Sequence, residues 1–388
     1  MNVRPNHHRR SAPVRALLLA LLTVLAAWTA LPAATAQEGR IKGWGANDNY
    51  QLGGTLTSAK YKPVTIPGAT GSSIDSLAAG YYHSLSLLSN GTVESWGRNA
   101  EGQLGIGSTA AQEQASTVTG LRGVVAVAAG NYHSLALLAD GTVRAWGRNS
   151  EGQLGDNSAT QRNTPVTVAG LTNVEAIAAG ALHSIAVLAD GTVKAWGYNA
   201  NGQLGDGTTS NRITPVTVTG LANARSVAGG SAHSLARLAD GTVWAWGRGS
   251  EGQLGDNTTT QRITPVRVDG ITTAREISAG VYHSVARLAD GTVKTWGYNA
   301  QGQQGDGTTT NRPAPITLDG ATNIRAISAG GYHTLVLDRD GRVSAVGYNN
   351  QGQIGNGSTT NQTTLTTPVN SLSSISLIAG GGEYSLAG

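Results

Sequence analysis

Short apolar segments, separated by Gly, Asp, Asn and Thr, recur along most of this chain. Four of them fall at 165–168, 174–178, 184–188 and 192–196, where Val, Ile, Leu and Thr partly alternate with polar residues. Such segments, bounded by turn residues, predict β-strands. No segment keeps a 3.6-residue apolar period over a useful length, so the pattern predicts an all-β chain.

Turn residues define how these strands connect. Asp190-Gly191 separates the last two segments and predicts a β-hairpin with a type I′ turn, in which both central residues have positive φ. Because proline cannot donate to a strand ladder, the strand that begins near Pro165 is expected at a sheet edge. The same proline recurs at Pro215, Pro265 and Pro315.

The strand pattern repeats along the whole chain. The dipeptide Trp-Gly occurs at Trp44, Trp96, Trp146, Trp196, Trp246 and Trp296 and becomes Val346-Gly347. The first gap is 52 residues and each later gap is 50, which gives seven units. A period of this length, with four short strands per unit, predicts a seven-bladed β-propeller with four-stranded blades.

The ends of the chain predict how the ring closes. Residues 38–45 match only the last strand of a unit, and residues 374–388 match the earlier strands. We therefore expect the N-terminal strand to pair with the C-terminal strands in one shared blade, which removes two exposed sheet edges.

The repeated sequence motifs resemble those of a known repeat family. Residues 133–155, "HSLALLADGTVRAWGRNSEGQLG", resemble the repeat of the regulator of chromosome condensation family, and the resemblance extends over 37–388. It implies a seven-bladed propeller. The nuclear founders of that family act on a small GTPase and dock on chromatin, and secreted bacterial propellers of this repeat type inhibit β-lactamases. The resemblance therefore implies a protein-binding scaffold.

The repeated His and Ser raise the question of catalysis. A His-Ser pair recurs at His83, His133, His183, His233 and His283, and His333 is followed by Thr334. Catalytic constellations are normally unique, neighbouring strand residues point to opposite faces, and no nucleophile elbow precedes any pair. We expect each imidazole to bond a backbone group or a neighbouring blade, and we predict no catalytic residues.

Other repeated words also predict structure rather than chemistry. Gly102 and Gln103, with their repeats, are expected in a tight turn whose backbone groups the glutamine satisfies. Asp156, Asp206, Asp256 and Asp306 each precede an Arg by six residues. One carboxylate with a nearby cation predicts an ion pair rather than a calcium site. No cofactor or metal is expected.

The first 36 residues predict a cleaved signal peptide, since four arginines precede an apolar run and an Ala-Thr-Ala site. Localisation would then be secreted, with no membrane association after cleavage. The remaining chain has 23 basic and 23 acidic residues, so no electrostatic attraction for nucleic acid is expected. Zero Cys excludes disulfides and thiolate sites. We expect a monomer.

Function in a repetitive scaffold should lie where the copies differ. The positions before the repeated His and after Trp-Gly vary most, and they supply a set rich in Tyr, Trp and Arg, which is typical of protein-binding hot spots. The candidate partner-binding residues are Tyr81, Tyr82, Tyr132, Tyr198, Trp244, Arg248, Tyr282, Tyr298, Tyr332 and Tyr348.

Two functions remain open for this set. The first is binding of an extracellular protein, including inhibition of an extracellular enzyme. The second is a carbohydrate-binding or wall-associated module that uses the tyrosines as stacking platforms. In a third reading, the tyrosines only line the channel or cover the blade edges.

Overall fold

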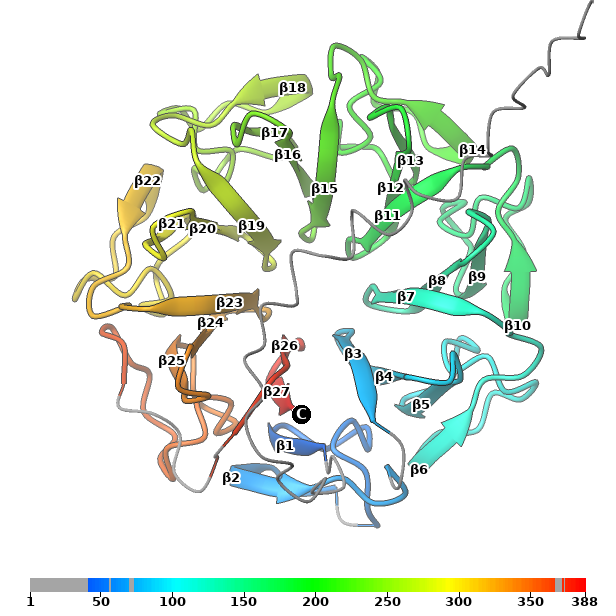
Figure 1. Cartoon of the computed structure of the whole chain (residues 1–388), viewed down its shortest axis with the longest axis horizontal. Helices are drawn as coiled ribbons and strands as arrows, with labels where there is room; N and C mark the ends of the chain where they lie inside the picture. Colours follow the sequence, from blue (N-terminus) through cyan, green and yellow to red (C-terminus); the bar gives the residue numbers. More distant parts are fainter. Residues whose placement is uncertain (1–40, 56, 70–72, 367–371, 373) are drawn as a thin grey trace, which may run out of the picture. The chain divides into compact units, whose positions relative to one another are not determined.

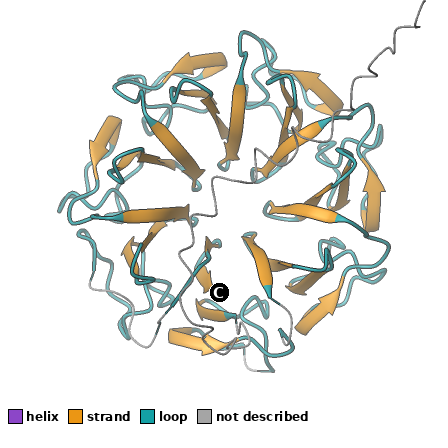
Figure 2. Cartoon of the chain, viewed as in Figure 1, coloured by secondary structure: helices purple, strands orange, loops and turns teal. Residues whose placement is uncertain are grey.

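The computed structural model describes residues 41–388 except 56, 70–72, 367–371 and 373. The predicted signal peptide, 1–36, lies outside the described residues. Every regular element in the described part is a β-strand (Figure 2). Seven sheets surround a central channel, which confirms the seven-bladed β-propeller (Figure 1).

In each blade the innermost strand lies along the channel. These strands are β3 (Ile74–Ala79), β7 (Val124–Ala129), β11 (Val174–Ala179), β15 (Ala224–Gly229), β19 (Ala274–Ala279), β23 (Ile324–Ala329) and β26 (Ile378–Gly380). The second strand starts at the repeated His or at Tyr384. The second strands are β4 (His83–Leu88), β8 (His133–Leu138), β12 (His183–Leu188), β16 (His233–Leu238), β20 (His283–Leu288), β24 (His333–Asp338) and β27 (Tyr384–Ala387).

The third strand carries the repeated Trp and is almost fully buried. The third strands are β5 (Val93–Gly97), β9 (Val143–Gly147), β13 (Val193–Gly197), β17 (Val243–Gly247), β21 (Val293–Gly297), β25 (Val343–Gly347) and β1 (Lys42–Gly45). The outer strand carries a Pro at its fourth position in five blades, the fifth being Pro63 of β2. The outer strands are β6 (Gln112–Thr117), β10 (Arg162–Thr167), β14 (Arg212–Thr217), β18 (Arg262–Arg267), β22 (Arg312–Thr317) and β2 (Lys60–Thr65).

The structure confirms the predicted edge position of the proline strands and corrects their blade. Strand β10, which contains Pro165, pairs with β9, so it is the last strand of one blade rather than the first of the next. In the sixth blade the outer position is taken by an irregular segment, in which Gln362 forms an isolated bridge with Gly347.

The predicted hairpins are present, but their turn is not type I′. In the turn after β12, Gly191 has a φ of 83° whereas Asp190 is not among the residues with positive φ. Its side chain instead accepts the N–H of Thr192 at 2.8 Å. A three-residue loop that ends in a left-handed Gly explains this geometry, since only the last residue needs positive φ.

Ring closure follows the prediction. The N-terminal strand β1 pairs with β27 and β2, in a sheet of order β2-β1-β27-β26. The first and last described strands are therefore neighbours in one blade (Figure 1).

The tryptophans fill the spaces between blades, as expected. Trp196 of β13 packs on Leu135, Val143 and Leu154 of the preceding blade, and its indole N–H donates to the Gln153 carbonyl at 2.9 Å. Burying an indole of ~150–250 Å² contributes about 4–6 kcal/mol. Val346 replaces Trp in one blade, and there Leu318 replaces the usual Val and approaches the turn glycine Gly305.

The His and Ser side chains form a second link between blades. His133 Nε2 lies 2.9 Å from Ser184 Oγ of the next blade, and that hydroxyl donates to the Gln153 carbonyl at 2.8 Å. A serine that already donates must accept from the imidazole, so Nε2 carries the proton. The other such pairs are His83–Ser134, His183–Ser234, His233–Ser284, His283–Thr334 and His333–Ser385.

Tyr384 replaces the seventh histidine and completes the ring of links. Its hydroxyl lies 2.9 Å from Ser84 Oγ and donates to the His83 carbonyl at 2.6 Å. Its single proton is placed on the His83 carbonyl, so Tyr384 links two blades as the histidines do but through a different acceptor.

Acid should weaken this ring. Burial lowers the pKa of His83, His133, His233 and His333 to about 3 and that of His183 and His283 to about 4. Since an unfolded His has a pKa of about 6.5, the unfolded chain binds more protons below that pH, and stability falls as the pH falls. At pH 5 each His should cost about 2 kcal/mol of unfolding free energy.

Melting measured between pH 7.5 and 5 tests this prediction. The expected result is a steep fall in melting temperature, and a smaller fall in His133→Gln, which cannot titrate. An unchanged melting temperature between pH 7.5 and 5 would contradict the assigned buried, neutral imidazoles.

The closing link can be tested at one hydroxyl. Tyr384→Phe removes the contacts to Ser84 and His83 and should lower the unfolding free energy by about 1–3 kcal/mol. Tyr61→Phe, on a ring that is 47% exposed, is the matched control and should change it by less than about 0.5 kcal/mol. Equal melting temperatures for the two variants would show that Tyr384 does not close the ring.

Candidate binding face

Each blade brings its two most variable positions together. The backbone N–H of Arg98, directly after Trp-Gly, donates to the carbonyl of Tyr82, directly before the repeated His, at 3.0 Å. The equivalent bonds, 2.8–2.9 Å long, join Arg148–Tyr132, Tyr198–Leu182, Arg248–Ala232, Tyr298–Tyr282, Tyr348–Tyr332 and Ala46–Glu383. The two variable positions therefore form one surface, at the end of the channel where the inner strands finish.

Backbone bonds also join these turns around the ring. The N–H of Tyr81 donates to the carbonyl of Gly130 in the next blade at 3.3 Å. The further links are Asn131–Ala181, Ala181–Gly230, Ser231–Val281, Val281–Gly331, Gly331–Gly381 and Gly382–Gly80. Since every turn is bonded to its neighbour, the side chains on this face have fixed positions relative to one another.

A first cluster of aromatic rings lies over the blades of β3 and β7. The Tyr81 and Tyr82 ring centroids are 4.6 Å apart, and Tyr82 stacks on Tyr132 at 5.7 Å. The Arg98 guanidinium lies 5.6 Å from both Tyr82 and Tyr132. The Arg148 guanidinium lies 5.7 Å from the centroid of the Tyr132 ring. The rings and guanidinium groups form a continuous half-buried layer.

A second cluster lies over the blades of β19 and β23. Tyr332 contacts Tyr282, Tyr298 and Tyr348 in edge-to-face arrangements at 6.2, 6.1 and 6.3 Å. Arg248 lies 4.8 Å from the Tyr282 ring. The structure therefore brings seven of the eight predicted tyrosines into two clusters, the eighth being Tyr198.

Glu383 lies between the two clusters, in the shared blade. A Cβ on its neighbour Gly382 would come within 2.6 Å of the Tyr81 ring, so Tyr81 packs directly on that glycine. Burial, and then the charge of Asp48, raise the pKa of Glu383. Burial and then Glu383 raise the pKa of Tyr81. The charge of Glu383 also raises the pKa of Tyr332, after burial and the neighbouring tyrosines.

Sequence reasoning missed Glu383. Its position is the one held by Tyr82 and Tyr132 in other blades, but the missing His makes the unit difficult to align. Aligning Tyr384 with the repeated His, rather than treating the unit as degenerate, gives this position.

We name the combined surface the tyrosine face and define it as Tyr81, Tyr82, Arg98, Tyr132, Arg148, Arg248, Tyr282, Tyr298, Tyr332, Tyr348 and Glu383. The predicted Tyr198 lies at the same end of its blade but contacts none of the other tyrosine rings, because its blade presents Ala181 and Leu182. The contacts between tyrosine rings on the tyrosine face are therefore interrupted over the blades of β11 and β15.

Trp244 does not belong to this face. It follows the first residue of β17 and lies opposite Ala236 and Arg267, near the hairpin at the other end of the blade. Its variability in sequence made it a candidate, but its position in the strand separates it from the tyrosines.

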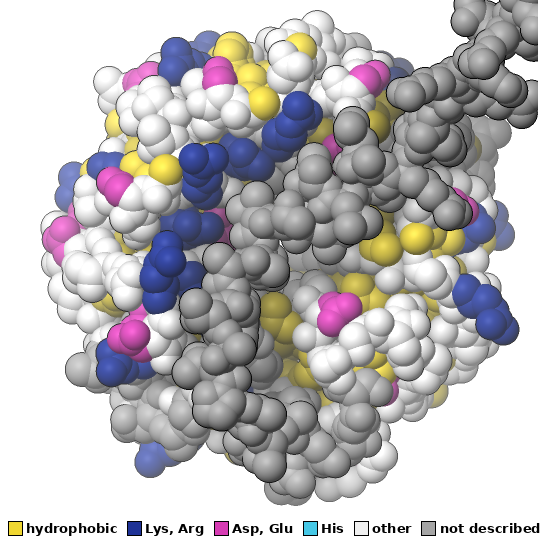
Figure 3. All heavy atoms as spheres, in the orientation of Figure 1, with side chains coloured by type: hydrophobic (Ala, Val, Ile, Leu, Met, Phe, Trp, Pro, Cys, Tyr) yellow, Lys and Arg dark blue, Asp and Glu magenta, His cyan; other side chains and the backbone are white. Residues whose placement is uncertain are grey.

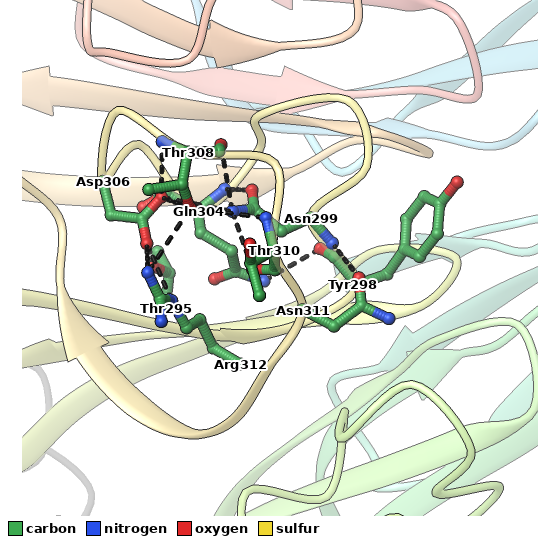
Figure 4. A network of polar contacts seen from close by, with 9 residues as sticks. All are labelled: Thr295, Tyr298, Asn299, Gln304, Asp306, Thr308, Thr310, Asn311 and Arg312. Carbon is green, nitrogen blue, oxygen red and sulfur yellow. Dashed lines mark hydrogen bonds and ion pairs between the residues drawn. The ribbon is translucent and has the colours of Figure 1, made fainter.

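Loops beside the tyrosine face are fixed by polar networks (Figure 4). The side-chain amide of Asn299 donates to the carbonyls of Thr308 and Thr310 at 3.2 and 3.1 Å, and its oxygen accepts the N–H of Gln304 at 2.9 Å. Gln304 replaces a repeated Leu and donates to the Tyr298 carbonyl at 2.9 Å. The network holds the backbone of Tyr298 while its ring points away from the loop (Figure 4).

The predicted loop ion pairs are present. Arg162, Arg212, Arg262 and Arg312 reach Asp156, Asp206, Asp256 and Asp306 at 2.8, 2.7, 2.7 and 2.5 Å. The repeated Gly also has positive φ, for instance 74° at Gly102.

Among the described residues, no group of three or more His, Asp or Glu side chains could hold a metal ion.

Comparison with known families agrees with this architecture. The RCC1-like domain model matches residues 7–334, and regulator of chromosome condensation repeats match 324–353 and 340–387. This chain belongs to the RCC1-like domain family. Within the described residues, no helix is long and apolar enough to cross a bilayer.

Solved structures share the RCC1-like propeller. Human WBSCR16 superposes with a TM-score of 0.78 at 24% identity, over 90% of this chain and 98% of that one. Prp20p from Saccharomyces cerevisiae, studied for binding to Gsp1p and histones, gives a TM-score of 0.80 at 24% identity, over 91% and 92%. At this identity the likeness establishes the fold.

Curated relatives match over a short part of their length. The mitochondrial RCC1 domain-containing protein RUG3 of Arabidopsis thaliana is 39% identical over 88 residues, 23% of this chain and 20% of that protein. The probable E3 ubiquitin-protein ligase HERC6 of Homo sapiens is 34% identical over 114 residues, 29% of this chain and 11% of that protein. Their activities therefore do not transfer with the match.

Proposed function

We propose that this propeller is a secreted, non-enzymatic scaffold that binds a protein partner through the tyrosine face. The observation that carries the proposal is the concentration of tyrosine and arginine at the positions where the repeats differ, on a face whose turns are bonded into a ring. Tyrosine provides a broad contact area at low entropic cost, and such residues dominate binding hot spots.

The charges of the face favour a partner with a basic side chain at its centre. Arg98, Arg148 and Arg248 are already paired with Glu101, Glu151 and Glu251 at 2.8, 3.8 and 3.4 Å. These arginines therefore add planar surface rather than net charge. Glu383 has no ion-pair partner among the described residues, and aromatic rings with a carboxylate suit a Lys or Arg side chain.

The repeated His and Ser side chains support the absence of catalysis. The six repeated histidines and the residues that follow them are fully buried, with 0% exposure. Each imidazole is bonded to the neighbouring blade, so a substrate would have to disrupt the ring to reach it.

Family precedent adds modest support. Prp20p was studied for its binding to a protein, Gsp1p, and to histones. A scaffold of this family can thus present a binding surface to a protein, although nothing about those partners transfers. The predicted signal peptide directs our proposal to an extracellular partner, including an enzyme that the propeller would inhibit.

The central test replaces tyrosines from both clusters. The mature chain captures its partner from the culture medium, and the affinity is measured by calorimetry. Tyr82, Tyr132 and Tyr282 changed together to Ala should lose more than about 2 kcal/mol of binding energy, which is about a 30-fold change in Kd. The variant should retain its circular dichroism spectrum. The control Tyr61→Ala removes an exposed tyrosine on β2 and should bind as the unchanged protein does.

Glu383→Lys tests the polarity of the face and should abolish capture of a partner with a basic contact residue.

If the triple variant stays folded and keeps full affinity, the tyrosine face is not the binding site. If it unfolds, the tyrosines serve packing alone. The carbohydrate-module alternative would be supported if the unchanged protein captured no protein but bound a glycan array, and if the triple variant lost that glycan binding. If the captured partner is an enzyme, its activity is measured with and without the propeller to test for inhibition.

A further inference from the structure

Five arginines gather on the face opposite the tyrosine face. Arg225, Arg275 and Arg325 are the second residues of β15, β19 and β23, at the ends where the inner strands begin, and all three are exposed. Arg237 and Arg287 are the fifth residues of β16 and β20 and are half-buried. We name these five residues the arginine band. Lys and Arg side chains form a dark blue band over these blades in Figure 3.

The arginine band is largely without counter-charge. Arg287 pairs with Glu276 at 3.0 Å. Arg237 donates to the Ser226 hydroxyl at 3.2 Å, and Arg225 donates to the carbonyl of its neighbour Ala224. Arg325 donates to the Ile375 carbonyl. Among the described residues, Arg275 has neither a hydrogen-bond nor an ion-pair partner, so four of the five cations lack a carboxylate.

These cations also act on one another. After burial, the nearby charges of Arg275 and Arg225 lower the pKa of Arg237, so the three guanidinium groups repel one another. Several arginines elsewhere are paired with a carboxylate, as in the four Asp-Arg loops and at Arg98. Uncompensated repulsion costs stability, and an anionic ligand would relieve it.

The fold does not require arginine at these positions. The residues equivalent to Arg225 in the blades of β3, β7 and β11 are Asp75, Val125 and Glu175. Arginine at this position of the described inner strands thus occurs in three consecutive blades, those of β15, β19 and β23, once per blade. This arrangement matches a chain with regularly spaced anionic groups.

The chemistry of the five guanidinium groups indicates which class of ligand the arginine band would bind. Guanidinium forks pair with carboxylates through two parallel hydrogen bonds, which a Lys cannot do. None of the five arginines stacks on an aromatic ring among the described residues, so their planes are not taken up by cation–π contacts. We propose that the arginine band binds an acidic polysaccharide, a chain with carboxylates on successive sugars.

Nucleic acid fits this band less well. Duplex DNA carries one charge per about 1.7 Å and would extend across the face, where it would meet Glu175 and Asp75. Bases of single strands need aromatic platforms, and none contacts these arginines in the described part of the chain. A single narrow chain can follow three blades without reaching Glu175 or Asp75, and Glu276 within these blades is already paired with Arg287.

The test uses polygalacturonate as the acidic polysaccharide. Its affinity for the mature chain is measured by calorimetry, beside duplex DNA, poly-glutamate and neutral dextran. Arg225→Gln, Arg275→Gln and Arg325→Gln combined should weaken polygalacturonate binding at least tenfold and reduce its salt dependence. The matched control combines Lys42→Gln, Lys60→Gln and Lys62→Gln in the shared blade, removes the same charge, and should change the affinity less than twofold.

Several outcomes would overturn the proposal. These are no binding of polygalacturonate by the unchanged protein, equal losses in the two triple variants, and tighter binding of DNA or poly-glutamate. Melting curves check that the variants are folded, and single Arg275→Gln, with no contact to lose, should still weaken binding if the triple variant is unstable. The tyrosine triple variant should bind polygalacturonate normally, which separates this proposal from the protein-binding one.

Discussion

A ring of buried side-chain hydrogen bonds between blades governs the rest of this structure. Each imidazole donates to the hydroxyl of the next blade, and that hydroxyl donates to a glutamine carbonyl that also accepts the indole N–H, as at Gln103. The same glutamine carbonyl thus accepts hydrogen bonds from the hydroxyl residue and from the Trp that packs between the blades. Because a buried polar group without its partner costs about 1–3 kcal/mol, each blade can sit in only one register on its neighbour.

That constraint explains both the repetition and the variation in the sequence. The His, the following hydroxyl residue, the Trp and the turn glutamine must recur, since each satisfies a partner in another blade. Glycines before the His recur for a steric reason: a Cβ at Gly130 would lie 2.6 Å from His133 Nδ1. Residues outside this network are free to differ, and they are the ones that point to the two ends of the channel.

The sequence was sufficient to predict the repeat architecture, the edge strands and the structural role of the histidines, because all three depend on features present in many copies. It was insufficient where one copy departs from the others. Tyr384 takes the position of the repeated His and links the same two blades through its hydroxyl, and Glu383 beside it was missed because the unit has no His. Trp244 looked like a site residue because variability says nothing about which end of a strand a residue occupies. The type I′ turn was wrong because an Asp side chain can cap a three-residue loop as well.

The two faces illustrate what a rigid ring makes possible. The tyrosine face derives from turns that backbone bonds join in sequence, so its large rings are held in place without a dedicated core. Three of the five arginines of the arginine band lie at inner-strand starts that carry acidic or apolar residues in the blades of β3, β7 and β11, so the fold accepts unlike side chains there. The buried His and Ser side chains that join the blades belong to neither face. Substitutions at one end of the channel therefore need not disturb the other end. Under our two proposals, a single scaffold would present a protein-binding surface at one end of its channel and an anion-binding surface at the other.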